Sequence, residues 1–143
     1  MSLIIGKGVV EWIASRTGEF NCFGTDVGIG WAKHGKIVAG VAYANWNGKN
    51  VECHIASDGS KHWLTREYLR VIFHYPFCQL KAQRITVCVG EGNADSTRFV
   101  KHLGFTIEAK LKDAHPTGDL QVFRMFANEC RFLQVTHEQK LAA

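Results

Sequence analysis

The sequence has little of the features that mark special classes of protein. It contains only two prolines in 143 residues, and it has no low-complexity tract or internal repeat. The lack of linkers indicates one continuous domain of ordinary length. No apolar run approaches the roughly 20 residues that cross a bilayer. The first six residues are too few for a secretion signal, so we expect neither a targeting segment nor a membrane partner.

Cysteine and histidine occur outside the patterns that bind metals or form disulfide frameworks. The five cysteines never form a CxxC pair, and the seven histidines show no HExxH spacing. We therefore expect no metal and a reduced protein of the cytoplasm. Cys53 and His54 are neighbours on an expected strand, where side chains alternate, so they cannot form a thiol–imidazole pair. Cys78 and Cys88 are expected to be thiols of the core.

The excess of basic over acidic residues is also small. The chain has 17 basic and 13 acidic residues, a net charge of +4, and the basic residues are scattered. This small excess does not favour a nucleic-acid partner. Hydrophobic residues make up 46% and charged residues 21%, as in globular proteins. We interpret residues 1–139 as a single folded domain and residues 140–143 as a vector-derived tail.

Hydrophobic periodicity predicts helices and strands along the whole chain. Apolar residues recur at helical spacing in residues 8–17, and the period then changes to two. Three strands follow, with a turn at His34-Gly35 and a type I′ hairpin turn at Asn47-Gly48. These strands span residues 27–31, 37–43 and 50–56. They are expected to form an antiparallel meander.

The second half of the chain predicts two crossover helices. Thr65 is expected to cap a helix over residues 65–75 that Pro76 ends or kinks. Asn93 is expected to cap another helix that Gly104 stops. Strands are predicted before and after this second helix, at residues 84–89, 105–111 and 120–126. Helices that follow the third and fourth strands make part of the sheet parallel, so a mixed sheet is expected.

The segment from Asn93 to Phe105 carries the most specific pattern, N-x-x-S-x-x-x-V-x-x-L-G-F directly after a hydrophobic strand. Taken alone, it is typical of a capped helix with a glycine stop. The pattern also resembles the signature of the GCN5-related N-acetyltransferases (GNAT). It is most similar to the ribosomal-protein N-terminal acetyltransferases and to small phage-encoded members. The order of elements over residues 27–126 resembles that family as well.

This resemblance implies a fold and an activity. The fold is α/β (α+β), with a mixed, mostly antiparallel sheet of six to seven strands and a splayed parallel pair at residues 50–56 and 84–89. The gap would admit the pantetheine arm of acetyl-CoA. The implied reaction is acetyl transfer from acetyl-CoA to a primary amine by direct attack in a ternary complex. A protein N-terminus, a lysine or a small amine can be the acceptor. A non-catalytic module that binds coenzyme A or a protein is the alternative.

The resemblance also assigns roles to single residues. Glu52 would be the base, acting through a water, and Ser96 would be the acid because Val100 stands where many members have a tyrosine. The acceptor pocket would contain Trp31 and His54. The residues expected to bind the cofactor are Ile55, Ala56 and Ser57 on pantetheine, Gly59, Ser60, Lys61 and Thr65 on pyrophosphate, and Asn93 on the arm.

Simpler interpretations of these residues stay open. The usual Arg/Gln-x-x-Gly-x-Gly/Ala phosphate loop is missing, and residues 57–65 can instead be a solvated loop. Glu52 can be a solvated strand charge, His54 a hydrogen-bonded bystander, and Asn93 a helix cap alone. An exposed strand edge can pair two copies into a homodimer.

Overall fold

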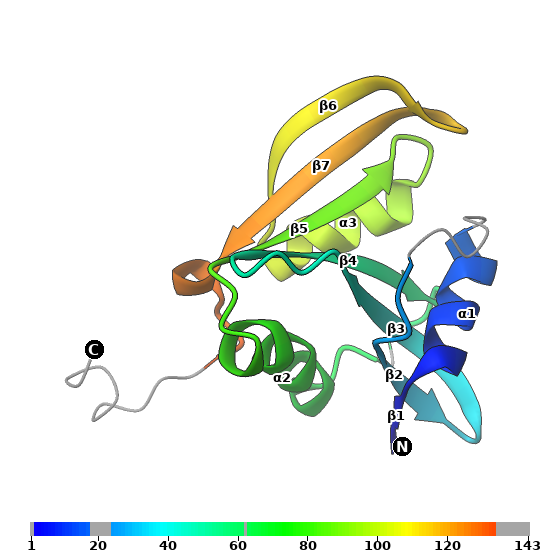
Figure 1. Ribbon diagram of the computed structural model, residues 1–143. Helices are drawn as coiled ribbons and strands as arrows, with labels where there is room; N and C mark the ends of the chain where they lie inside the picture. The colour runs from blue at the N-terminus through cyan, green and yellow to red at the C-terminus, as the bar shows by residue number, and fades with distance from the viewer. Residues whose placement is uncertain (1, 18–23, 62, 134–143) are drawn as a thin grey trace, which may run out of the picture.

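The computed structural model describes residues 2–17, 24–61 and 63–133, and these residues form a sheet of seven strands. The strand order is β1-β2-β3-β4-β5-β7-β6 (Figure 1). Within it, β4 and β5 are parallel and every other neighbouring pair is antiparallel. The arrangement confirms the predicted mixed α/β (α+β) fold. The strands are β1 Ser2–Ile5, β2 Gly28–Lys33, β3 Lys36–Ala44, β4 Asn50–Ser57, β5 Arg84–Gly90, β6 Thr106–His115 and β7 Gly118–Phe126.

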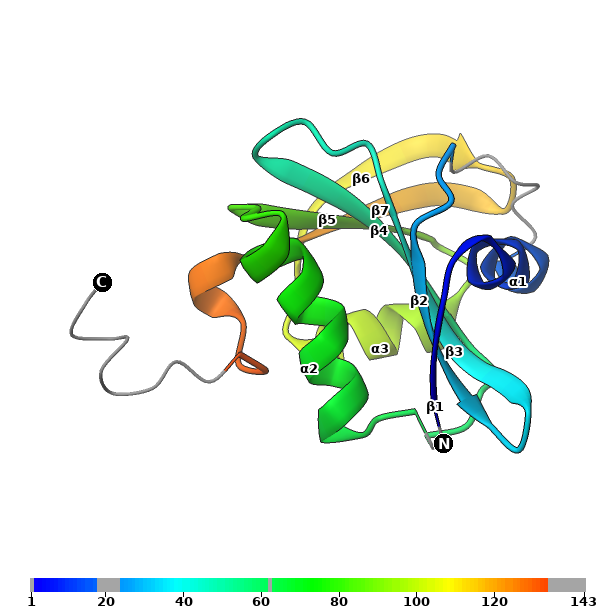
Figure 2. The ribbon, with the colours of Figure 1, turned by 60° about the horizontal axis from the view of Figure 1, so that its bottom comes forward.

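Helices cover both faces of this sheet. Helix α1 (Lys7–Thr17) packs on one face of β2, β3 and β4, and α2 (Arg66–His74) and α3 (Ala94–Leu103) lie on the other face (Figure 2). Among the described residues, no helix combines the length and the apolar character that spanning a membrane requires. The helices that follow β4 and β5 are the two crossovers expected from the sequence.

Helix α1 lies close to the sheet because the strands beneath it carry glycine. A Cβ atom on Gly30 would stand 3.0 Å from Val9 Cγ2, and one on Gly40 would stand 2.9 Å from Val9 Cγ1. A side chain at either position would push the helix away. Val9 and Ile13 are fully buried in this contact, with 0% exposure. The glycines that alternate with apolar residues in the sequence therefore form the surface on which α1 packs.

The main core lies on the opposite face, between the sheet and α2 and α3. Its buried tyrosines hydrogen-bond to backbone carbonyls, as buried phenols must. The Tyr68 hydroxyl on α2 donates to the Ile29 carbonyl on β2 at 2.8 Å, and the Tyr43 hydroxyl on β3 donates to the Ile72 carbonyl on α2 at 2.6 Å. These reciprocal bonds fix α2 against the meander.

The structure corrects the predicted elements in two places. Strand β1 was not expected; it is short, largely exposed and pairs with β2 at the edge of the sheet. The turn at Asn47-Gly48 is part of a longer loop over residues 45–49, because Asn47 Oδ1 accepts the N–H groups of Lys49 and Asn50 at 3.0 and 2.8 Å. The two residues are therefore not the centre of a type I′ turn.

The α-helix ends just before Pro76, as the sequence predicted. Helix α2 stops at His74 and continues directly into a π-helical turn, Tyr75–Gln79, with Pro76 at its start. The N–H of Leu80 reaches back to the carbonyl of Tyr75 at 3.0 Å. Proline has no N–H to donate, so it is tolerated at the first positions of a new hydrogen-bonding pattern.

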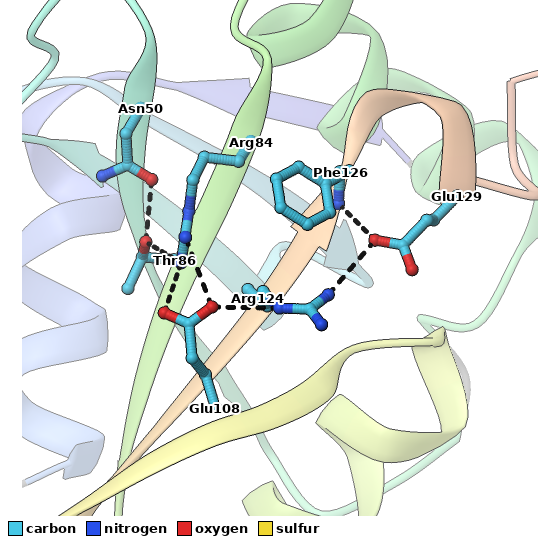
Figure 3. A network of polar contacts seen from close by, with 7 residues as sticks. All are labelled: Asn50, Arg84, Thr86, Glu108, Arg124, Phe126 and Glu129. Atoms are coloured by element: carbon cyan, nitrogen blue, oxygen red, sulfur yellow. Dashed lines mark hydrogen bonds and ion pairs between the residues drawn. The ribbon is translucent and has the colours of Figure 1, made fainter.

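A polar network holds one end of the parallel pair together (Figure 3). Thr86 Oγ1 on β5 donates to Asn50 Oδ1 on β4 at 2.7 Å. Arg84 forms a fork to Glu108 on β6, at 3.3 and 3.2 Å, and Arg124 on β7 reaches the same carboxylate at 3.0 Å. The network connects β4, β5, β6 and β7 at the end where β4 and β5 are hydrogen-bonded.

Candidate functional site

Strands β4 and β5 are paired at one end and separate at the other. Their parallel register runs from Asn50 opposite Arg84 to Cys53 opposite Val87, and neither strand pairs with the other beyond that point, although β4 continues to Ser57 and β5 to Gly90. A cavity of about 230 Å³ opens between the separated segments. The wedge predicted from the sequence is therefore present. Its walls include the last residues of β4 and β5 and residues of α3 from Ser96 to Leu103.

Helix α3 forms one wall of the cavity and begins at Asn93. The Asn93 Oδ1 atom accepts the N–H of Ser96 at 3.1 Å, and Gly104 ends the helix at a φ of 106°. The predicted cap and stop are both confirmed. Asn93, Ser96 and Val100 line the cavity. The capping bond uses the oxygen of the Asn93 amide.

A buried side chain fixes the start of α3 against the sheet. Gln121 on β7 is 7% exposed, and its Nε2 donates to Thr97 Oγ1 at 2.9 Å. Thr97 Oγ1 in turn donates to the Asn93 carbonyl at 2.9 Å. This chain of bonds sets the position of Asn93 relative to the end of β5, and so sets one dimension of the cavity.

The site residues predicted on β4 fall into two groups, on either side of the point where β4 and β5 separate. His54, Ile55, Ala56 and Ser57 all line the cavity, whereas Glu52 does not. Glu52 lies in the paired part of the strand, half-buried, and its Oε2 accepts the Asn45 Nδ2 at 2.9 Å. The alternation of the strand puts Glu52 and His54 on the same face. His54 is thus nearer than Glu52 to any group bound in the wedge.

The loop after β4 turns its polar groups toward its own backbone. The N–H of Gly59 donates to Ser57 Oγ at 3.2 Å, and the N–H of Ser60 donates to Asp58 Oδ1 at 2.9 Å. Gly59 has a φ of 90°, which an L side chain rarely adopts. Lys61 is exposed. None of Gly59, Ser60 and Lys61 lines the cavity. His62 lies outside the described residues.

Two further residues predicted for the site, Thr65 and Trp31, lie outside the cavity and have structural roles. Thr65 caps α2, since its Oγ1 accepts the N–H of Tyr68 at 3.2 Å. Trp31 is 2% exposed and packs in the core, with its ring centroid 5.6 Å from that of Tyr68. The indole is not among the residues that line the cavity between β4 and β5, and its expected place in an acceptor pocket stays a prediction. Residues of β2 alternate between α1 and the core, and Trp31 falls on the core side with Ile29.

Among the described residues, no group of three or more histidine, cysteine or acidic side chains is arranged to hold a metal ion. No protein-family model and no curated sequence matches the chain. Solved structures do match it. A single-residue mutant of the spermidine N-acetyltransferase SpeG from Vibrio cholerae is similar over 94% of this chain and 98% of its own, with a TM-score of 0.69 and 14% identity. The chain has the GNAT acetyltransferase fold.

Two further acetyltransferases with the GNAT fold are similar over less of their length. For the ribosomal-protein-S5-alanine acetyltransferase from Vibrio fischeri, the TM-score is 0.62 at 16% identity, over 73% of this chain and 63% of that protein. This chain therefore spans less than two thirds of that relative. For the Campylobacter jejuni N-acetyltransferase PseH, solved in complex with acetyl coenzyme A, the TM-score is 0.55 at 16% identity, over 71% and 67%.

Within this GNAT fold, several lining residues were missed or misplaced by sequence reasoning. Cys88 was expected in the core, but it is half-buried and lines the cavity. Cys78 was also expected in the core, but it is exposed on the π-helical turn. His115 and Thr117, at the turn between β6 and β7, close one end of the cavity. Strand alternation signals the face of Cys88, but no local pattern predicts the turn of a distant hairpin at this site.

Proposed function

We propose that this protein transfers an acetyl group from acetyl-CoA to a primary amine. The observation that carries the proposal is the wedge: β4 and β5 stop pairing after Cys53 and Val87, and a cavity of about 230 Å³ lies between them. An open gap inside a sheet is uncommon because backbone N–H and C=O groups there lose their partners. A ligand that carries amides can supply those partners.

The pantetheine arm of acetyl-CoA has this chemistry. It is narrow, and its two amides can pair with the backbone of a strand, as β5 would. Ile55, Ala56 and Ser57, which line the cavity together with His54, are the residues of β4 that would pair with it. A backbone N–H here would polarise the thioester carbonyl, as an oxyanion-hole donor does. Asn93 would steady the arm from the start of α3.

The pyrophosphate would lie at the open end of the gap, near residues 57–65. Lys61 supplies a cation, and Arg16 on α1 supplies a second, since its Nη2 donates to the Ser57 carbonyl at 3.0 Å. The carboxylate of Asp58 is turned to the N–H of Ser60, which offsets part of its repulsion toward phosphate. Gly59, Ser60 and Thr65 complete the proposed pyrophosphate site, where an anion would have to displace the bonds from Gly59 to Ser57 and from Ser60 to Asp58.

The acceptor amine must lose a proton, because a lysine amine with a pKa of about 10.4 is almost entirely charged at pH 7. Glu52 is the proposed base and acts through a water, held in position by Asn45. His54 is the second candidate, because it lines the cavity and an imidazole can accept a proton near neutral pH. Ser96 would return a proton to the departing thiolate.

A non-catalytic module that binds coenzyme A is the second candidate function. The backbone N–H groups of Gly59 and Ser60 already donate to side chains of the loop, so they are not preorganised for phosphate. Val100 rather than a hydroxyl-bearing residue stands one turn after Ser96. These features favour binding with little or no turnover.

Calorimetric titration followed by a thiol-release assay separates the two functions. We expect acetyl-CoA and desulfo-CoA to bind, and thiol to be released when amines or peptides are supplied. Glu52→Gln should lower turnover by about 10²–10⁴-fold while desulfo-CoA binding is kept. His54→Gln is the parallel variant, and Glu11→Gln, an exposed change on α1, is the control. Binding without thiol release for any amine would support the module, and no binding would refute the proposal.

A further inference from the structure

A buried tryptophan on the wall of the cavity has a hydrogen-bond donor without an acceptor. Trp63 is 0% exposed and is one of the residues that line the cavity between β4 and β5. Its indole Nε1 is buried and has no hydrogen-bond partner among the residues that the structure describes. Burial of an N–H group without an acceptor costs stability, because the group loses its bond to water and gains none in return. Such groups are rare in folded proteins, so this one calls for an acceptor that the described chain does not supply.

Aromatic packing holds this indole in place. The ring centroid of Trp63 lies 4.7 Å from that of Phe99 on α3 and 6.3 Å from that of Tyr68 on α2. Both helices lie on the same face of the sheet (Figure 2). Phe99 lines the cavity as well. Turning the N–H of Trp63 toward solvent would break these ring contacts, so the donor stays inside the protein.

The cavity wall around Trp63 is mostly apolar. The lining residues that belong to the main core or pack against it are, besides Trp63, Ile55, Val87, Val89, Phe99, Val100 and Leu103. A hydrogen bond formed in such surroundings is stronger than one in water, because the local dielectric constant is low. An apolar wall with one unpaired donor suits a ligand that is a narrow, largely apolar chain with a carbonyl oxygen along its length.

We propose that the indole N–H of Trp63 donates a hydrogen bond to an amide carbonyl oxygen of the coenzyme A arm, which makes Trp63 a binding residue of the cavity. The inference rests on the proposed function, because the arm must enter the wedge. The arm has two amides on a chain of methylene groups, and its amide carbonyls are the acceptors that the apolar wall lacks. Desulfo-CoA keeps both amides and has no thioester, so it tests an amide rather than the thioester as the acceptor.

The experiment compares two tryptophans that have the same unpaired donor. Trp31 is 2% exposed, its Nε1 has no partner among the described residues, and it also packs against Tyr68, but it does not line the cavity. Replacement by phenylalanine keeps an aromatic ring and removes the N–H. We expect Trp63→Phe to weaken desulfo-CoA binding by about threefold to tenfold in calorimetry, and Trp31→Phe to preserve the affinity.

Nuclear magnetic resonance observes the bond itself. The full chain has four tryptophans, and Trp12→Phe, Trp31→Phe and Trp46→Phe assign three of the four indole N–H signals. The fourth belongs to Trp63, so the titration of the unmodified sequence gives an answer even if Trp63→Phe fails to fold. We expect saturation with desulfo-CoA to move the Trp63 indole proton downfield and to slow its exchange with solvent, while the Trp31 signal changes little.

Three results would overturn the inference. A Trp63 indole signal that desulfo-CoA does not shift would show that the N–H is not the donor, for example because a buried water already accepts its bond. Equal affinity of Trp63→Phe and the unmodified protein would show that the bond adds nothing to binding. Equal weakening by Trp31→Phe would show a general effect of core packing. Desulfo-CoA binding without the expected shift refutes this inference alone, whereas absence of binding refutes the proposed function with it.

Discussion

Replacement of Gly90 by alanine tests the contact between the end of β5 and His115, at the turn between β6 and β7. A Cβ atom at Gly90 would lie 2.6 Å from both Cε1 and Nδ1 of His115 and 2.9 Å from its Nε2. The backbone of Gly90 is not in the left-handed region, so the cost of alanine is steric. His115 is held in this position by Thr117, whose N–H donates to Nδ1 at 3.2 Å. The imidazole must therefore move away from residue 90, and its hydrogen bond with Thr117 must break.

We expect Gly90→Ala to lower the free energy of unfolding by about 1 kcal/mol, because the half-buried His115 ring must move and lose its hydrogen bond to Thr117. For a domain of this size each kcal/mol lowers Tm by about 2–4 °C. Urea and thermal unfolding measure the loss. His115→Ala removes the obstructing ring, so Gly90→Ala should cost much less in that background, with a coupling energy close to the loss measured in the unmodified sequence. An unchanged stability of Gly90→Ala, or an equal loss in both backgrounds, would refute the reasoning.

Three further predictions concern stability. Asn93→Ala removes the acceptor of the Ser96 N–H and should cost about 0.5–2 kcal/mol in urea unfolding, whereas Asn93→Ser should keep most of the stability; equal losses would contradict the capping role. Glu108→Gln removes the charged partner of Arg84 and one of the two carboxylates that pair with Arg124, and it should cost about 1 kcal/mol, less in high salt; a loss that salt does not change would contradict an ionic network. Burial raises the pKa of Cys53, Tyr43 and Tyr68, so the folded protein keeps protons that the unfolded chain releases. The free energy of unfolding should therefore fall as pH rises above about 9, by up to about 1.4 kcal/mol per pH unit for each group. Urea unfolding measured at increasing pH tests this, and a free energy of unfolding that stays constant would contradict it.

Local signals account for most of the fold. The capped helix from Asn93 to Gly104 and the Thr65 cap were predictable because their hydrogen bonds lie within four residues of sequence. Strands β4, β5 and β7 were predictable because burial alternates along them between their two faces. Strand β1 lacked such a signal, since its four residues are largely exposed at the sheet edge. Asn47-Gly48 had a strong turn signal, but the side chain of Asn47 closed a wider loop.

The site was predictable only for residues on the strands and the helix that directly flank the gap. Residues 54–57 and Asn93 belong to elements that flank the gap, so a strand–helix pattern located them. The burial of Trp31 in the core was not predictable, because alternation defines two faces of a strand without saying which one meets the cavity. His115, Thr117 and Arg16 reach the site through hairpin and helix packing between segments far apart in the sequence. Tertiary packing decides such contacts, and no local spacing encodes them.

Titration of the protein with desulfo-CoA, in the unmodified sequence and in Ser96→Phe, addresses the wedge most directly. Ser96 is half-buried and lines the cavity, so a phenyl ring there would fill space that the pantetheine arm needs. Lys101→Phe, on the exposed side of the same helix, is the matched control. We predict saturable binding that Ser96→Phe weakens by about tenfold or more and that Lys101→Phe preserves. Absence of binding in the unmodified protein, or equal affinity in both variants, would contradict the wedge as the coenzyme A site.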